Sequence, residues 1–216
     1  TVSNMIKRPC LLIFGHGYTA NAFADYIRNI DWEIFGTTRN SQTADLLIKK
    51  GVKPLMWSDG SKIKSVINRA DYILHSIPPT EIGDPVYKRF SKAIMSRSTN
   101  LSWFGYLSTT SVYGNHDGKW VDENIPVNPS SNRGLLRVKA ENNWSNIKDL
   151  PLHIFRLAGI YGPNRSPLDK IRSGKAQLIS KPGQFFSRIH VEDIARVLKA
   201  SIEMPSHGSV YNVCDD

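Results

Sequence analysis

The sequence of 216 residues predicts an α/β fold, a doubly wound parallel sheet with helices on both of its faces. Short apolar runs that suit buried strands alternate with amphipathic runs that suit helices, which is the pattern of parallel βαβ units. The first strand-like run also reaches its helix through two closely spaced glycines, Gly15 and Gly17. A strand, a glycine turn and a helix in this order form the opening unit of a dinucleotide-binding sheet.

The glycine turn follows the predicted strand Cys10–Phe14 and precedes a helical pattern that runs to about Ile30. In the spacing Gly15-x-Gly17-x-x-Ala20, the first glycine permits a tight turn and the second lets a pyrophosphate approach the backbone. Ala20 lets the helix pack close to the strand, and the phosphates would meet unpaired N–H groups at the helix start. The alternative is a strand-to-helix turn without a ligand. The predicted cofactor-binding residues of the turn are Gly15, Gly17, Tyr18, Thr19 and Ala20.

The end of the second predicted strand, Trp32–Thr37, distinguishes between two cofactors. An NAD site would carry Asp or Glu about 20 residues after the glycines, to bind the ribose hydroxyls. This sequence has Thr38 and Arg39 there. An arginine can pair with a 2′-phosphate and a hydroxyl can bond to it. We therefore predict NADP rather than NAD, with an ordinary exposed charge as the alternative role for Arg39.

The elements that follow continue the alternation. Pro78 and Pro79 end the fourth predicted strand, because proline cannot continue a central strand. That strand end faces the cofactor crevice of a doubly wound sheet, so Ile77 and Pro78 are expected to contact the cofactor. The remaining expected strands are Val52–Trp57, Tyr72–Ile77, Trp103–Ser108 and Val210–Cys214, and the remaining expected helices are Ser41–Lys50, Ser61–Asn68, Val86–Met95, Leu168–Arg172 and Val191–Glu203.

Composition narrows the function classes. The formal net charge is +9, but lysines and arginines are scattered with never more than two in a row, which favours a solvated surface and an anionic cofactor over nucleic acid. No apolar run approaches the ~18 residues of a membrane span. Cys10 and Cys214 lie in apolar runs and are expected to be buried free thiols in a reducing cytoplasm. No Cys/His spacing indicates a metal site.

Five blocks in the second half of the chain resemble a known family. The blocks are Ser108–Gly114 (STTSVYG), Glu123-x-x-Pro126-x-x-Pro129, Arg156-Leu157 with Ile160–Pro163 (IYGP), Arg188–Ala195 (RIHVEDIA) and Tyr211–Val213 (YNV). In this order they are similar to blocks of the extended and atypical short-chain dehydrogenase/reductases, in particular the bacterial nucleoside-diphosphate-sugar epimerase-like (NAD-dependent epimerase/dehydratase) group.

The resemblance implies a Rossmann domain over 5–163, part of a small substrate lobe over 164–190, and the last helix and strand of the Rossmann domain over 191–216. The lobe is expected to be incomplete, since family members continue through further helices; a fragment and a reduced lobe are both open. The implied cofactor is NADP or NAD. The implied partner is a small-molecule substrate, either a nucleotide sugar or another anionic carbonyl compound. The oligomeric state is open.

The sequence departs from the family at its catalytic helix. The family carries Tyr, then Lys four residues on, then usually Glu four further; here these positions are Arg133, Arg137 and Glu141. Arginine keeps its proton because its pKa lies above ~12, so Arg133 cannot be the general base. Lys139 lies roughly 200° round the helix from Arg137 and cannot replace the family lysine. Arg137 can still bind the nicotinamide ribose or an anionic group.

Two further residues are candidates for the chemistry. Thr109 matches the family's catalytic Ser/Thr and can hydrogen-bond a substrate oxygen. Tyr113 is a substitute acid, or alternatively a half-buried aromatic residue with a satisfied hydroxyl. The expected lobe has a basic face that suits an anionic substrate, formed by Arg165, Lys170 and Arg172. A solvated basic turn explains these three residues equally well.

Two functions remain open: altered oxidoreductase or epimerase chemistry, and a non-catalytic NADP(H)-binding sensor or scaffold.

Overall fold

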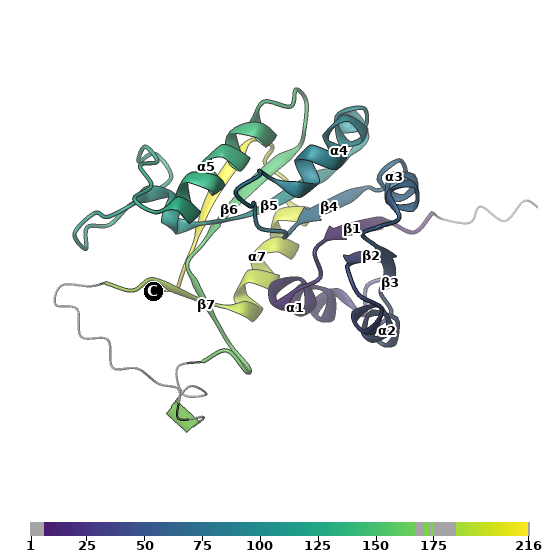
Figure 1. Ribbon diagram of the computed structural model, residues 1–216, viewed down its shortest axis with the longest axis horizontal. Helices are drawn as coiled ribbons and strands as arrows, with labels where there is room; N and C mark the ends of the chain where they lie inside the picture. Colours follow the sequence, from purple (N-terminus) through teal and green to yellow (C-terminus); the bar gives the residue numbers. More distant parts are fainter. Residues whose placement is uncertain (1–6, 167–170, 173, 175–184, 216) are drawn as a thin grey trace, which may run out of the picture.

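A seven-stranded parallel sheet organises the computed structural model, which describes residues 7–166, 171–172, 174 and 185–215. The strand order is β3-β2-β1-β4-β5-β6-β9, so the order reverses between β1 and β4 (Figure 1). Ligands of doubly wound sheets bind at such a switch point, beyond the carboxyl ends of the strands. The strands are β1 Cys10–Phe14, β2 Glu33–Thr38, β3 Lys53–Met56, β4 Tyr72–His75, β5 Trp103–Thr109, β6 Leu152–Leu157 and β9 Ser209–Val213.

Helices cover both faces of the sheet, as Figure 1 shows. One face carries α3 (Gly60–Ile67), α4 (Pro85–Met95) and α5 (Asn132–Ser145); the other carries α1 (Tyr18–Ile27), α2 (Ser41–Lys49) and α7 (Val191–Glu203). Two short 3-10 helices flank β5: η1 (Ser98–Asn100) and η2 (Thr110–Tyr113). The predicted fold class is confirmed.

The alternation of side chains along β1 explains the two hydrophobic cores. Leu12 and Phe14 pack with the face that carries α3 to α5, whereas Leu11 and Ile13 pack with the face that carries α1 and α7. Successive side chains of a strand point to opposite faces, so a strand buried on both sides reads as an unbroken apolar run. All five residues of β1 are fully buried.

Most helices of the described chain begin at a residue whose side chain accepts a backbone N–H. Asn40 caps α2, Asp59 caps α3, Asp84 caps α4 and Ser131 caps α5. Helix α1 is different, because its N-cap is Gly17, which has no side chain to accept these bonds. Helix α1 therefore begins without the side-chain cap that these other helices have.

Three features differ from the sequence predictions. Strand β6 was not among the expected strands, and a small parallel sheet of β7 (Gly159–Tyr161) and β8 (Arg188–His190) was not expected either. Cys10 is buried, but the prediction that Cys214 is buried is wrong: it is exposed, because it lies just beyond the end of β9. The predicted helix Leu168–Arg172 lies largely outside the described residues. Lys170, which was expected to contribute to the basic face, also lies outside them.

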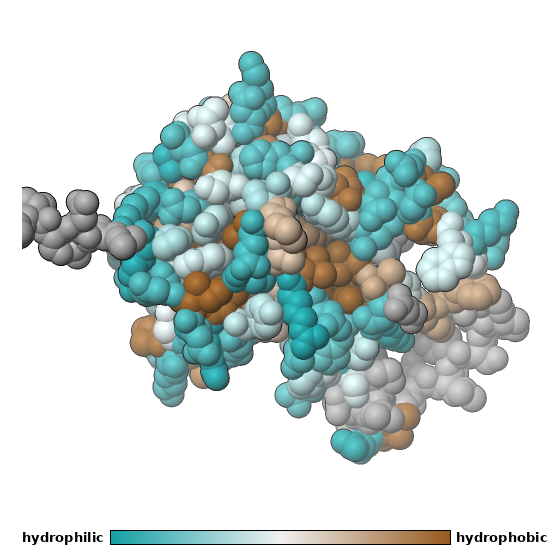
Figure 2. Space-filling view, turned by 180° about the vertical axis from the view of Figure 1, so that it is seen from behind, coloured by the Kyte–Doolittle hydropathy of each residue, from teal (hydrophilic) through white to brown (hydrophobic). Residues whose placement is uncertain are grey.

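The surface is mostly polar. From behind, Figure 2 shows hydrophilic residues over most of the face with smaller apolar areas between them. In the part of the chain that the structure describes, no helix is long and apolar enough to cross a membrane. Nor do these residues contain a cluster of His, Cys, Asp and Glu side chains that would hold a metal ion.

Candidate functional site

A cavity of about 560 Å³ lies beyond the carboxyl ends of β1, β2 and β4. Six of the predicted cofactor-binding residues line it, namely Gly15, Gly17, Thr38, Arg39, Ile77 and Pro78. Of the others, Thr19 lines a neighbouring cavity, and Ala20 is buried in the core beneath α1. The hydroxyl of Tyr18 donates a 2.9 Å hydrogen bond to the carbonyl of Pro163.

Gly15 makes the turn that brings β1 to the edge of this cavity. Its φ of +81° is a left-handed conformation that glycine adopts without strain. A Cβ at this position would lie 2.6 Å from the Cγ1 atom of Ile77, so a side chain would collide there. The Gly15 N–H donates a 2.8 Å hydrogen bond to Oγ1 of Thr37, which ties the turn to β2.

Gly17 opens the cavity toward the start of α1. A Cβ at Gly17 would meet no atom within 4 Å, so the space beside its backbone is open. The first turn of α1 carries no acidic residue, and its N-cap residue makes no side-chain cap. An open cradle beside the N-terminus of a helix fits a pyrophosphate. The residues present therefore fit a nicotinamide dinucleotide, which supplies hydride transfer when it is bound.

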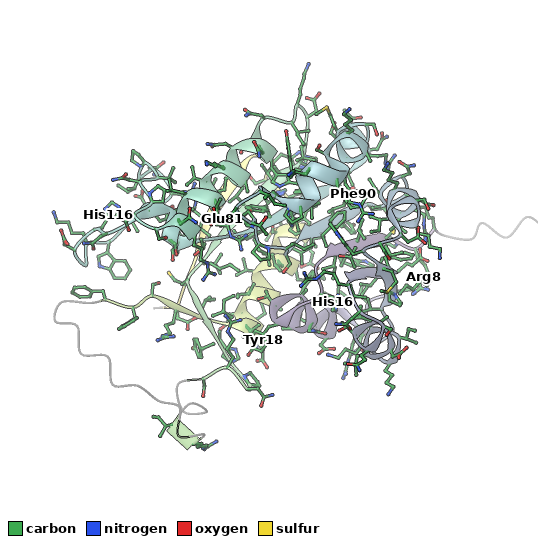
Figure 3. The ribbon with its side chains drawn as sticks, viewed as in Figure 1. Arg8, His16, Tyr18, Glu81, Phe90 and His116 are labelled. Atoms are coloured by element: carbon green, nitrogen blue, oxygen red, sulfur yellow. The ribbon has the colours of Figure 1, made fainter. Side chains whose placement is uncertain are left out.

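His16, between the two glycines, was not singled out by the sequence prediction. It lines the cavity and is 8% exposed, and neither ring nitrogen has a hydrogen-bond partner among the described residues. Burial, followed by the nearby charge of Lys50, lowers the pKa of His16 to about 4, so the ring is uncharged at neutral pH. Figure 3 shows His16 beside the start of α1, close to Tyr18. A buried polar group without a partner is rare in proteins and is typical of ligand sites.

The end of β2 forms the far wall of the same cavity. Thr38 is buried and Arg39 is exposed; both line the cavity together with Asn40 and Thr43. No Asp or Glu is among the described residues that line it. This is the charge pattern that the sequence predicts, with an arginine where an NAD site carries an acid.

A second cavity of about 260 Å³ adjoins the first, and Ser76 lines both. It lies at the carboxyl ends of β5 and β6, beneath the first two turns of α5. Thr109 and both arginines of the altered catalytic positions, Arg133 and Arg137, line it as the resemblance implies. Arg165, from the segment after β7, completes the wall. The two cavities thus form one cleft along the switch-point edge of the sheet.

Arg137 is held firmly in this second cavity. The side chain is 8% exposed, and its Nη1 atom donates to the carbonyl of Leu107 at 2.6 Å and to the hydroxyl of Tyr106 at 3.2 Å. Burial raises the pKa of the Tyr106 phenol, so that phenol accepts this bond in its neutral form. The guanidinium of Arg137 is therefore fixed by β5 in the wall of this cavity.

Tyr113 lies in a different place from the other catalytic candidates. Its ring is 2% exposed, and it borders a third cavity, of about 570 Å³, beside the loop over residues 114–131. Its hydroxyl donates to Oδ1 of Asn212 at 2.8 Å and accepts from Nη1 of Arg156 at 2.8 Å. These contacts satisfy the hydroxyl, and they set Tyr113 apart from the cavity of Thr109 and the arginines. An acid role for Tyr113 stays a prediction.

A buried ion pair supports the wall between the second and third cavities. Nη2 of Arg156 lies 2.8 Å from Oε2 of Glu141, and the hydroxyl of Ser108 also donates to this carboxylate. Burial opposes the charge of Arg156, but its hydrogen bonds to Glu141 raise the arginine's pKa above the usual value. The role of Arg156 could not be found from the sequence, because its partners lie far from it along the chain.

The fold and the cleft define a dinucleotide-binding α/β protein. Residues 11–214 match the NAD dependent epimerase/dehydratase family. The chain belongs to this family. Its known relatives include Protein YeeZ of Escherichia coli (strain K12), which is 24% identical over 213 residues that cover 94% of this chain and 76% of that protein.

Two solved structures are similar to this chain. A conserved protein of unknown function from Silicibacter pomeroyi DSS is 47% identical, with a TM-score of 0.88, and the match covers 96% of this chain and 72% of that one. A UDP-glucuronic acid 4-epimerase from Bacillus cereus in complex with NAD is 18% identical, with a TM-score of 0.73 over 96% of this chain and 78% of that one. The second likeness is one of fold.

Proposed function

We propose that this chain is an NADP(H)-binding member of the epimerase/dehydratase family whose oxidoreductase or epimerase chemistry is altered by the loss of the Tyr/Lys pair. The observation that carries the cofactor assignment is the position of Arg39. Its side chain lines the dinucleotide cavity at the end of β2, where the described lining contains no carboxylate that would compete for it. Thr38 adds a hydroxyl beside it.

The chain's own residues then have separate tasks. Gly15, Gly17 and the first N–H groups of α1 would hold the pyrophosphate, and Arg39 would pair with the 2′-phosphate. Thr109 would hydrogen-bond a substrate oxygen in the second cavity. Arginine side chains at positions 133 and 137 stay protonated, so they bind and orient charge but do not shuttle a proton.

A non-catalytic NADP(H)-binding sensor or scaffold is the second candidate. It is favoured by Arg137, whose bond to the Leu107 carbonyl fixes a permanent cation where the family has the lysine that tunes its tyrosine. The two candidates share the cofactor and differ in turnover. The substrate of an active enzyme would be a nucleotide sugar or another anionic carbonyl compound. The lack of a membrane-crossing helix in the described residues is consistent with the proposed cytoplasmic location.

The cofactor assignment is tested by calorimetric titration of the full chain with NADPH and NADH. Arg39→Ala should weaken NADPH binding by roughly tenfold or more, because a hydrogen bond to a charged group is worth about 1.5–3 kcal/mol, and should barely change NADH binding. Arg28→Ala is the matched control, since Arg28 is exposed at the other end of α1. Equal affinity of the unmodified chain for both cofactors would contradict the assignment.

A further inference from the structure

The second cavity has an unusual balance of charge. Arg133, Arg137 and Arg165 all line it, and no Asp or Glu is among its described lining residues. None of the three guanidinium groups forms an ion pair within 4.0 Å in the part of the chain that the structure describes, whereas Arg156, which does not line this cavity, pairs with Glu141. The wall of the cavity therefore carries three cationic side chains and no paired carboxylate among its described lining residues.

The geometry of α5 makes this arrangement costly without a ligand. Arg133 and Arg137 are four residues apart on one helix, so they share a face, and like charges at this spacing destabilise a helix by about 0.2–0.5 kcal/mol. Arg165 adds a third cation from across the cavity, where its guanidinium carbon lies 5.3 Å from the centre of the Tyr18 ring. An anion between the three side chains would remove this repulsion.

Hydroxyl groups complete the wall. Thr109 and Ser111 line the cavity, and their hydroxyl oxygens lie 3.1 Å apart. Ser76 contributes a further hydroxyl at the junction with the dinucleotide cavity. Hydroxyl donors beside guanidinium groups match the oxygens of a carboxylate or phosphate, which accept several hydrogen bonds at once.

We infer that this cavity binds the anionic head of the substrate, a carboxylate or a phosphate held by Arg133, Arg137 and Arg165. The inference rests on the proposed function, because it assigns one part of the small-molecule substrate to the same cleft. The volume sets the size of the group: at about 260 Å³ the cavity is smaller than the roughly 300–1,000 Å³ of pockets that enclose a whole drug-sized ligand. It therefore takes a small charged group that lies next to the dinucleotide cavity.

The test is a titration of the full chain with small probes at constant ionic strength, followed by nuclear magnetic resonance of the arginine side-chain N–H groups. The probes are inorganic phosphate, acetate and acetamide, which is the uncharged analogue of acetate. Phosphate or acetate should shift the arginine signals with saturation, and acetamide should not. Tighter binding of phosphate than of acetate would assign the head group as a phosphate, and the reverse order would assign a carboxylate.

Variants on α5 distinguish anion binding at this specific site from nonspecific attraction of anions to a positively charged protein. Arg133→Gln should weaken binding of the preferred anion by about tenfold or more, since it removes a charged hydrogen-bonding partner. Lys139→Gln removes the same charge from an exposed position on the same helix and should leave that affinity unchanged. Arg133 is itself exposed, so its variant is expected to fold. Equal anion affinity in the two variants would overturn the inference, as would binding of acetamide as tight as that of acetate.

A second series distinguishes this site from the cofactor cradle. With NADPH bound, the anion should still bind and still depend on Arg133. Loss of anion binding on addition of NADPH would mean that the probe occupies part of the cofactor's own site, which overturns the inference and leaves the cofactor assignment intact. Conversely, absence of NADPH binding to the unmodified chain would defeat the proposed function, while the dependence of anion binding on Arg133 would still support an anion site.

Discussion

Arg156 donates a hydrogen bond of 2.8 Å from Nη1 to the hydroxyl of Tyr113, and its guanidinium carbon lies 5.0 Å from the centre of the tyrosine ring. The same guanidinium pairs with Glu141, on the helix that carries the altered catalytic positions. A buried network of this kind fixes β6, η2 and α5 relative to one another, because removing one member leaves the others unsatisfied.

We expect Tyr113→Phe to lower the free energy of unfolding by about 1–3 kcal/mol, because it leaves the buried Arg156 N–H and the Asn212 oxygen without a partner. Urea denaturation measures this change. Tyr26→Phe is the control, since Tyr26 is 51% exposed on α1 and should change stability little. If Tyr113→Phe instead left stability unchanged and removed a measurable turnover, Tyr113 would be the substitute acid.

Gly17→Val should abolish dinucleotide binding without unfolding the protein. Gly17 has φ −90° and ψ −159°, which other residues adopt without strain, and its Cβ would meet only open space. Stability should therefore change by no more than about 0.5 kcal/mol, as for a surface substitution. Calorimetry with NADPH measures the loss of binding, and unchanged affinity would place the cofactor elsewhere.

Gly15→Ala provides the contrast, because φ is +81° there and the new Cβ would lie 2.6 Å from Ile77 Cγ1. This variant should be destabilised by about 1 kcal/mol or more in the same denaturation experiment. A Gly15→Ala protein as stable as the unmodified chain would show that the turn relaxes more easily than its geometry implies.

Stability should fall as the pH is lowered from about 6.5 to 4. Burial lowers the pKa values of His16 and His153 to about 4 in the folded state, against 6.5 for an exposed histidine. The unfolded chain therefore binds more protons than the folded chain in this window. Each histidine lowers the free energy of unfolding by up to roughly 3 kcal/mol at pH 4. Urea denaturation at pH 7.5 and pH 5 measures the slope. His16→Gln should reduce the slope, because it removes one of the two buried rings. A slope of zero in the unmodified chain would contradict the burial of both rings.

The unmodified chain should show no ordinary short-chain dehydrogenase turnover. The family reaction needs a group that shuttles a proton, and Thr109 is too weak an acid or base to do so unaided. Assays with NADPH against a panel of carbonyl compounds and nucleotide sugars test this expectation. Arg133→Tyr combined with Arg137→Lys would restore the family pair on one face of α5, and Lys139→Gln is the control on the opposite face. Robust reduction or epimerisation by the unmodified chain would show that another residue moves the proton.

The sequence by itself determined the parallel sheet, the order of its first five strands along the chain and the glycine turn. These features depend on local patterns: unbroken apolar runs for strands buried on both faces, and glycines where the backbone must turn tightly or leave open space. The sequence also predicted that Arg39 and Ile77 belong to one site, and both line the first cavity, because strand ends in such a sheet meet at one edge.

Only the tertiary structure decided which distant side chains meet. Tyr113, Arg156 and Asn212 are brought together by η2, β6 and β9, and nothing in their local sequence specifies that contact. Likewise, Arg165 lines the same cavity as Arg133, and the turn after β7 in which Gly162 pairs with Arg165 helps to place it there. Local sequence sets backbone conformation, whereas the partners of a long polar side chain are set by the packing of elements far apart in the chain.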